Sequence, residues 1–436
     1  MTTNIARTLT SNGSRRKGTL SFWYKKCEVG TSRMVYQSYT SGGNNHNILF
    51  NTDDTLRFTS QVSSSKKIDL VTTRVFRDPN AWYHIVTAFD TEQGTASNRA
   101  KMYINGVQET VLTNASGSSP TYPSQDQDLQ VNISGEHIYF NKNGDGAGME
   151  ATCVYSHIHY IDGTMYDASA FGSFDSTTGE WKINTSPSVT YGTNGFFILK
   201  DGNSVTDQSG NSNDFSVEQG TLTNTQDCPS NNFCTINPLS SHSAITLSKG
   251  NTQVDYSTNA ENGKGNLAFS SGKFYWEAKL SAVNSNYPMI GIGSVDEAQM
   301  QKPSGGSYPG GFTNSYGIYG NGNVYANGSN TGSQSFTYTT NDYIGIAVDL
   351  DSGTKTIKWF KNGTQIATYN ITTTAPFAPM DYSGSGSDEL VYNFGNGAFG
   401  TTQLTGTTYQ GSGNLGIFKY QPPSGYTALC TKGLNE

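Results

Sequence analysis

The chain has 436 residues, too many for one ordinary hydrophobic core and suited to two or three domains. Only 14% of the residues are charged, the net charge is −7, and the densest basic cluster is 15–17 (RRK), so we expect no binding of nucleic acid. No apolar stretch is long enough to span a bilayer, and the N-terminus lacks the apolar core of a secretory signal. We therefore expect no membrane insertion and folding in a cytoplasm.

The composition favours strands over helices. The chain holds 26 Tyr, 21 Phe and 49 Gly, and it is poor in the runs of Leu, Ala, Glu and Lys that build surface helices. Aromatic residues fit pleated, half-buried surfaces, and glycine fits turns. The sequence therefore predicts an all-β protein with many turns.

Apolar residues alternate with polar ones in short segments along both halves of the chain. In the first half, the pattern predicts strands at 19–24, 82–89, 101–104 and 154–161. In the second half, it predicts strands at 274–280, 289–293, 343–350 and 356–360. No segment keeps a helical period, and only 167–171 (DASAF) suits a short helical turn.

Each half also contains an Asn-Gly pair directly after a predicted strand, Asn105-Gly106 and Asn362-Gly363. Asn-Gly is the preferred two-residue hairpin turn, because both positions must adopt a positive φ. We expect one such hairpin in each half.

The segment 225–243 has the features of a domain boundary: two prolines, few aliphatic residues and many turn-forming side chains. We predict three parts, a polar N-terminal tether at 1–18, a first sandwich at 19–235 and a second sandwich at 236–436. The tether has no obvious partner strand, so we expect it to hold a neighbouring molecule.

The five cysteines, Cys27, Cys153, Cys228, Cys234 and Cys430, are scattered and form no CxxC pair. A zinc site is therefore not expected. Cys228 and Cys234 are close enough in sequence to bridge, but five reduced thiols fit a cytoplasmic protein better.

The first half resembles the concanavalin A-like, laminin-G-like (LamG) jelly roll. The resemblance rests on 18–26 (GTLSFWYKK), 82–86 (WYHIV) and 103–107 (YINGV), in that order. Residues 150–238, which end in DCPSNNFCTINP, look like a family of virion proteins of tailed bacteriophages, especially marine ones.

The second half is similar to SPRY (B30.2-type) domains. It carries 272–277 (GKFYWE), 290–293 (IGIG), 344–351 (IGIAVDLD), 358–363 (KWFKNG) and 392–395 (YNFG) in the order of that family. The two resemblances imply two consecutive antiparallel β-sandwiches, a concanavalin A-like jelly roll followed by a SPRY-like sandwich.

No constellation of catalytic residues is visible. A glycosidase on a concanavalin-like sheet needs paired carboxylates in an E-x-D-x-x-E strand, and the chain has none. Asp349 and Asp351 share strand parity, but Asp351 reads better as the start of a turn. His157 and His159 also share a predicted face, which is weak spacing for a metal. We therefore expect no enzymatic activity and no catalytic or metal-ligating residues.

Calcium is a secondary candidate as a cofactor, because LamG and lectin domains often bind it in loops. The candidate ligands are Asp201, Asp207 and Asp214, or the turn at 143–145. Oxygen-rich loops are also what ordinary turns look like, so the prediction for this protein is no cofactor, with calcium as the alternative.

The segment 304–333 is rich in Tyr, Gly, Ser and Asn, the composition of an adaptable recognition surface. We predict Tyr308, Tyr316, Tyr319 and Tyr325 as ligand contacts, although Tyr316, Tyr319 and Tyr325 also suit ordinary strand positions. Tyrosine faces with hydrogen-bonding neighbours suit a sugar.

The resemblances imply a non-enzymatic structural protein of the virion, a fibre or appendage that attaches to host-surface glycan. One alternative is a capsid or tail decoration protein with a purely architectural role, and a second is a polysaccharide depolymerase. The expected partners are other virion proteins, copies of the same chain and host glycan, and the expected location is the virion.

Overall fold

The structure is a computed structural model that describes residues 2–146, 148–200, 202, 204–284, 288–301 and 307–435. The chain divides into two compact units, Met1–Leu222 and Thr223–Glu436. Among the described residues, no helix is long and apolar enough to cross a membrane.

The strands of the first unit are β1 (Asn4–Thr8), β2 (Lys17–Lys26), β3 (Arg33–Ser41), β4 (Asn44–Phe50), β5 (Thr55–Val62), β6 (Ser65–Val75), β7 (Trp82–Asp90), β8 (Ala100–Ile104), β9 (Val107–Gln108), β10 (Leu112–Thr113), β11 (His137–Phe140), β12 (Cys153–Asp162), β13 (Gly172–Phe174), β14 (Trp181–Ile183), β15 (Phe196–Ile198) and β16 (Ser216–Gln219). Two 3-10 turns, η1 (Ala96–Asn98) and η2 (Ala168–Ala170), interrupt them.

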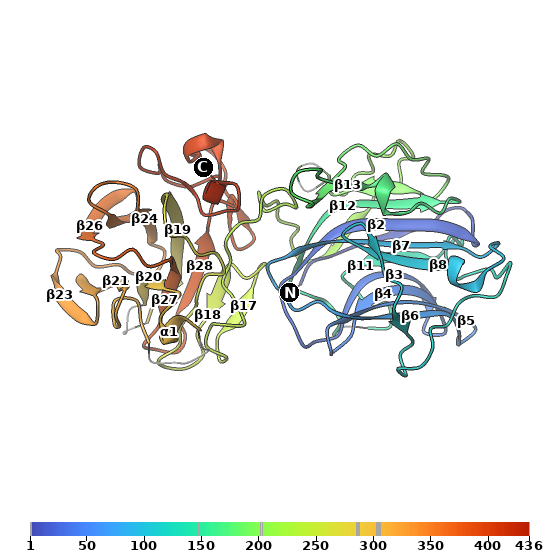
Figure 1. Ribbon diagram of the computed structural model, residues 1–436, viewed down its shortest axis with the longest axis horizontal. Coiled ribbons are helices and arrows are strands. Elements are labelled where there is room, and N and C mark those ends of the chain that lie inside the picture. The colour runs from blue at the N-terminus through green and yellow to red at the C-terminus, as the bar shows by residue number, and fades with distance from the viewer. Residues whose placement is uncertain are drawn as a thin grey trace. The chain divides into compact units, whose positions relative to one another are not determined.

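The first unit is a sandwich of two antiparallel sheets. One sheet has the order β10-β6-β5-β4-β3-β11-β1-β16 and the other β15-β12-β2-β7-β8-β9. Figure 1 shows the layer of β2, β7 and β12 stacked on the layer of β3, β4 and β6. The side chains between the layers are aromatic and aliphatic, among them Phe22, Tyr24, Ile48 and Phe58.

A long connection covers the outward face of the six-stranded sheet. It includes β13 and β14, and β13 lies beyond β12 in Figure 1. Phe171 and Trp181 of the connection pack over Val86, Tyr103 and Ile161, which point away from the main core. Burial of this second apolar layer explains why the strands β2, β7 and β12 are apolar on both faces.

The elements of the second unit are β17 (Thr246–Ser248), β18 (Gln253–Asp255), β19 (Lys273–Ala282), β20 (Met289–Ser294), α1 (Ala298–Gln301), β21 (Ser315–Tyr319), β22 (Asn323–Ala326), β23 (Ser329–Ser333), β24 (Tyr343–Asp349), β25 (Thr356–Lys361), β26 (Thr364–Asn370), β27 (Phe377–Tyr382), β28 (Glu389–Asn393), β29 (Ala398–Phe399), β30 (Thr402–Gln403), η3 (Ser412–Asn414), β31 (Thr427–Ala428) and η4 (Gly433–Asn435).

The second unit is also a sandwich. One sheet runs β17-β18-β28-β19-β24-β25-β26, with β31 beside β19, and the other runs β23-β22-β21-β20-β27. Trp276 and Trp359 are buried in its core, and the Trp359 indole donates a hydrogen bond to the Ile290 carbonyl across the two sheets at 3.2 Å. The prediction of two all-β sandwiches is confirmed.

Both predicted hairpin turns are present. Asn105 and Gly106 have φ values of 48° and 81° between β8 and β9, and Asn362 and Gly363 have values of 50° and 84° between β25 and β26. All four residues occupy the left-handed region that this turn requires.

The structure differs from the sequence prediction at two boundaries. Residues 1–18 are not a tether without a partner strand, because Asn4–Thr8 forms β1, which pairs with β11 on one side and β16 on the other. The units divide at Leu222, before the predicted boundary at 235, because Phe233 and Cys234 pack within the second unit.

Candidate functional site

The four predicted contact tyrosines do not share one face. Tyr316 lies in the core of the second unit with 0% of its surface exposed, and its ring packs against Phe377. Tyr316 cannot contact a ligand from this position, so its prediction as a contact is wrong. Side chains alternate between the two faces of a strand, and Tyr316 shares the inward face of β21 with Ile318, two residues further on. The composition of the segment did not distinguish this face from the outward one.

Tyr319 and Tyr325 lie on the outward face of the five-stranded sheet. Met289 pairs with Tyr319 on one side and with Tyr382 on the other, so these three side chains point the same way. Tyr325 pairs with Gly317, and Gly317 lies two residues before Tyr319 on the same face of β21. The sheet therefore presents three tyrosines from β21, β22 and β27.

Tyr308 reaches the same face from the loop that precedes β21. Its ring centroid is 5.7 Å from that of Tyr325 and 5.6 Å from that of Tyr382. The loop approaches closely because Gly317 has no side chain: a Cβ there would lie 2.4 Å from the Pro309 carbonyl oxygen. We call Tyr308, Tyr319, Tyr325 and Tyr382 the tyrosine face.

All four members of the tyrosine face are half-buried. Burial raises the pKa of Tyr382, and the neighbouring Tyr308 and Tyr319 add to the effect, so its hydroxyl stays neutral and able to donate. Half-buried phenols offer a ring surface and a hydroxyl together, which suits a ligand with apolar ring faces and polar edges. Part of the predicted recognition segment, 302–306, lies outside the described residues.

Tyr382 was missed by the sequence analysis. It ends β27 in the segment FAPMDY, which no sequence-predicted strand covered. The only signal in this segment was that alternate residues, those at 378, 380 and 382, would share one side of a strand. Pro379 weakened this signal, because proline is rare inside a sheet.

The acidic pair noted in the sequence organises a turn. The Asp349 carboxylate accepts hydrogen bonds from the backbone N–H groups of Asp351 and Ser352, at 3.0 and 2.9 Å. It also forms an ion pair with Lys273 at 3.1 Å. Asp351 in turn accepts a hydrogen bond from the Gly272 N–H at 2.7 Å. Both carboxylates therefore accept hydrogen bonds from backbone N–H groups.

The two histidines of β12 both lie beside Phe197. His157 adopts a φ of 49° within an irregularity of the strand register, and its ring centroid is 5.9 Å from that of Phe197. His159 is buried, stacks on Phe197 with ring centroids 3.9 Å apart, and hydrogen-bonds the Tyr191 hydroxyl through Nδ1 at 2.9 Å.

Another buried histidine, His84, anchors the connection over the six-stranded sheet. The Trp181 indole donates to His84 Nδ1 at 3.0 Å, so His84 Nε2–H is left to donate to the Ser21 hydroxyl at 2.9 Å. Burial lowers the pKa of His84 to about 3, which keeps the ring neutral. Its role is structural.

The candidate calcium ligands have other partners. Asp207 accepts hydrogen bonds from the backbone N–H groups of Phe197, Ser209 and Asn213, and Asp214 accepts one from Asp207 N–H. Within the described ranges, no three His, Cys, Asp or Glu residues are grouped to hold a metal ion. Asp201 lies outside the described residues. Because three backbone N–H groups already point their positive ends at the Asp207 carboxylate, a cation at that position would be repelled by them.

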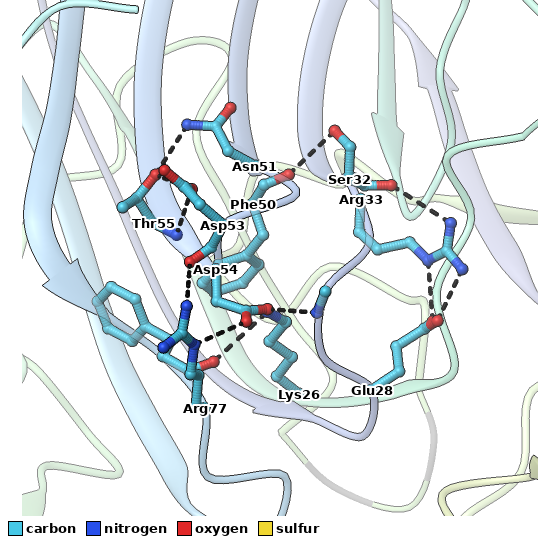
Figure 2. A network of polar contacts seen from close by, with 12 residues as sticks. Lys26, Glu28, Ser32, Arg33, Phe50, Asn51, Asp53, Asp54, Thr55 and Arg77 are labelled. Atoms are coloured by element: carbon cyan, nitrogen blue, oxygen red, sulfur yellow. Dashed lines mark hydrogen bonds and ion pairs between the residues drawn. The ribbon is translucent and has the colours of Figure 1, made fainter. Parts of the chain in front are cut away.

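A buried charge network in the first unit surrounds Asp54 (Figure 2). Lys26, with 1% of its side chain exposed, donates to Asp54 Oδ1, and Arg77 Nε lies 3.2 Å from Oδ2. The Gly30 N–H also donates to Oδ1 at 2.7 Å. Burial favours the neutral acid, but Lys26, Gly30 and Arg77 together hold the pKa of Asp54 below its usual range.

This network closes the loop between β2 and β3. Lys26 Nζ also lies 4.7 Å from the centre of the Phe50 ring. Arg33 donates hydrogen bonds to both carboxylate oxygens of Glu28, at 2.9 and 2.6 Å. Its charges are therefore paired internally. The basic cluster at 15–17 is likewise paired, with acidic residues at 90, 92, 126 and 128. None of the five cysteines, all within the described residues, forms a disulfide.

The comparisons with known proteins agree with this division. Residues 3–141 match the Concanavalin A-like lectin/glucanases superfamily, and residues 273–397 match the SPRY domain. No curated protein matches the chain.

Similar solved structures are SPRY domains. The crystal structure of the TRIM65 PSpry domain is 16% identical and covers 37% of this chain and 88% of its own, with a TM-score of 0.31. The SPRY domain of human HERC1 is 18% identical and covers 36% of this chain and 96% of its own, with a TM-score of 0.30. The two family matches carry the assignment: this chain consists of an N-terminal concanavalin A-like domain of the LamG type followed by a C-terminal SPRY domain.

Proposed function

We propose that this chain is a non-enzymatic recognition protein whose SPRY domain binds a sugar on the tyrosine face. The observation that carries the proposal is the convergence of four half-buried tyrosines from three strands and one loop, in which the Tyr308 ring centroid lies 5.7 Å from that of Tyr325 and 5.6 Å from that of Tyr382. Sugar rings stack on such faces, and the phenol hydroxyls offer hydrogen bonds at the edges.

We further propose that the protein is a component of a bacteriophage virion, a fibre or appendage that attaches to host-surface glycan. The resemblance of residues 150–238 to phage virion proteins supports this part of the proposal. Contacts with other virion proteins and with copies of the same chain would follow from it. A capsid or tail decoration protein without a ligand is the competing proposal, and localisation on the particle by electron microscopy separates the two.

The sugar proposal is tested with the double variant Tyr308→Ala/Tyr382→Ala. Each ring loses aromatic contacts worth about 0.5–1.5 kcal/mol, so the double variant should weaken binding by about fivefold to about 150-fold. Binding is measured by glycan array and titration calorimetry with the full chain. Tyr409→Ala is the matched control, because Tyr409 is also half-buried in the second unit but lies outside the tyrosine face.

Unchanged glycan binding in the double variant would contradict the role of the tyrosine face. Release of reducing ends from host polysaccharide by the wild-type chain would contradict the non-enzymatic part and favour a depolymerase.

A further inference from the structure

Asn262 is a buried neighbour of the tyrosine face. It belongs to a segment that runs antiparallel to the end of β27, with Glu261 opposite Ser383 and with backbone hydrogen bonds that continue the pairing to Gly265. This register places Asn262 opposite Tyr382. Cross-strand partners point to the same face of a sheet, so the Asn262 side chain lies on the face that carries the tyrosines.

Asn262 holds the loop that carries Tyr308. Its Nδ2 atom donates a hydrogen bond to the Ser307 carbonyl oxygen at 3.1 Å, and Ser307 directly precedes Tyr308 in the chain. Asn262 is 0% exposed, so it cannot touch a ligand from this position. Any effect of Asn262 on a ligand must therefore pass through the loop.

The other side of the loop is held by Ser315 of β21. The Ser315 hydroxyl accepts hydrogen bonds from the N–H groups of Gly310 and Phe312, at 3.0 and 3.2 Å, and donates one to the Phe312 carbonyl at 2.6 Å. Phe312 itself is buried in a small apolar cluster. Tyr308 therefore lies between two anchors, Asn262 before it and Ser315 after it.

These anchors decide where the Tyr308 ring stands. The other three tyrosines of the face belong to strands, whose backbone hydrogen bonds fix them. Tyr308 lies in a loop, yet its ring centroid is 5.7 Å from that of Tyr325 and 5.6 Å from that of Tyr382. A ring without anchors would have to be ordered when a ligand binds, and ordering a side chain at a binding surface lowers the affinity.

We infer that Asn262 is a positioning residue of the tyrosine face, which fixes Ser307 and thereby sets the Tyr308 ring in place before a sugar binds. The inference rests on the proposed sugar site but names a residue that lies outside it. Asn262 supplies the donor that the Ser307 carbonyl requires, because a carbonyl oxygen can only accept. The affinity of the site therefore depends on a side chain that never meets the ligand.

The test measures the binding of maltohexaose, cellohexaose and N-acetylchitohexaose to the full chain by titration calorimetry. Asn262→Ala removes the anchor before Tyr308. We expect it to weaken the affinity for whichever of these probes the wild type binds by about twofold to about twelvefold. Asn262→Asp, which keeps the size of the side chain but replaces the donor with an acceptor, gives the same test should Asn262→Ala not fold.

Asn266→Ala is the matched control. Asn266 lies on the same segment, but its amide nitrogen donates to the Thr235 hydroxyl at 2.6 Å instead of holding the tyrosine loop. Its removal should leave the affinity unchanged. Thermal unfolding of each variant shows whether the second unit stays folded.

A double-mutant cycle separates positioning from a general effect on the fold. In the Tyr308→Ala background, Asn262→Ala should cause no further loss of affinity, because its effect passes through a ring that is already absent. An equal loss in both backgrounds would overturn the inference and assign Asn262 a role in the fold alone.

Nuclear magnetic resonance with selectively labelled tyrosines tests the positioning without a ligand. We expect nuclear Overhauser effects between the Tyr308 and Tyr382 rings in the wild-type chain, and Asn262→Ala should weaken them. Unchanged ring contacts in a folded Asn262→Ala variant would also overturn the inference. Failure of all three probes to bind the wild-type chain counts against the proposed sugar site alone, since the ring contacts still decide whether Asn262 positions Tyr308.

Discussion

Asp54 in the first unit and Glu277 in the second are both buried carboxylates, but the two domains stabilise them differently. Asp54 faces the cations Lys26 and Arg77 and accepts one backbone N–H. Glu277, on β19, accepts hydrogen bonds from the Lys419 and Tyr420 N–H groups at 3.0 and 2.8 Å.

Glu277 also contacts Asn393 Nδ2 at 3.0 Å and the Tyr275 hydroxyl at 3.3 Å, and no ion pair with it is found among the described residues. Burial raises the pKa of Glu277 to about 7, whereas the cations hold that of Asp54 below its usual range. The difference teaches that the neutral donors around Glu277 accommodate its buried carboxyl without offsetting burial, whereas the two cations beside Asp54 do offset it.

The largest effect is expected from removing the buried cation of the first unit. Lys26→Met leaves Asp54 buried with only Arg77 and one N–H, and the loss of one partner of a buried pair costs about 3–5 kcal/mol. The free energy of unfolding is measured through amide hydrogen exchange in β2. A loss below about 1 kcal/mol would show that Arg77 and Gly30 alone can hold the carboxylate.

The second prediction concerns pH and the second unit. Because the pKa of Glu277 is raised from 4.5 to about 7, the folded domain binds more protons than the unfolded chain between these values. The contribution of Glu277 to stability is therefore fully present below about pH 4.5 and is lost as the pH rises to about 7. The contribution reaches about 3 kcal/mol, at about 1.4 kcal/mol per pKa unit.

Glu277→Gln removes this titration. The unfolding free energy of the second unit should then lose the decrease that Glu277 contributes in the wild type between about pH 4.5 and about pH 7. Chemical denaturation across this range is the measurement, and an unchanged slope would assign the pH dependence to another group.

A smaller effect is expected for the connection over the six-stranded sheet. Trp181→Phe deletes the donor to His84 Nδ1 and leaves a buried acceptor unpaired, at a cost of about 1–2 kcal/mol. Amide exchange in 163–195 should accelerate. Val111→Ala, at an exposed position, serves as the control and should stay within about 0.5 kcal/mol of wild type.

The smallest effect on stability is expected from removing Arg77, the second cation beside Asp54. Arg77 contacts the same Asp54 carboxylate, but 61% of its side chain is exposed. Solvent screens such a cation, so Arg77→Met should cost less than about 1 kcal/mol. If Arg77→Met is as harmful as Lys26→Met, exposure does not explain the difference between the two cations.

Much of the fold could be predicted from local pattern. The Asn-Gly turns and the alternating strands each depend on a few neighbouring residues, and both were confirmed. The strand β1 was missed because it has only five residues and its partners begin at His137 and Ser216, too far away for a local signal.

The site was predicted less well for a related reason. Composition identified the tyrosine-rich segment but not which face each ring occupies. Strand parity already placed Tyr316 and Tyr319 on opposite sides of β21, and only the sheet order shows which side is the core.

The position of β1 between β11 and β16 has a consequence for how the first domain forms. Ile5 pairs with Phe140 and with Val217, so the eight-stranded sheet gains its last strand only after the ribosome has synthesised more than two hundred residues. Closing such long loops costs entropy before any contact compensates for it, and proteins dominated by distant pairings fold slowly. We therefore expect the LamG-type domain to complete its folding only after its whole length has been synthesised, with its first strand among the last to be incorporated.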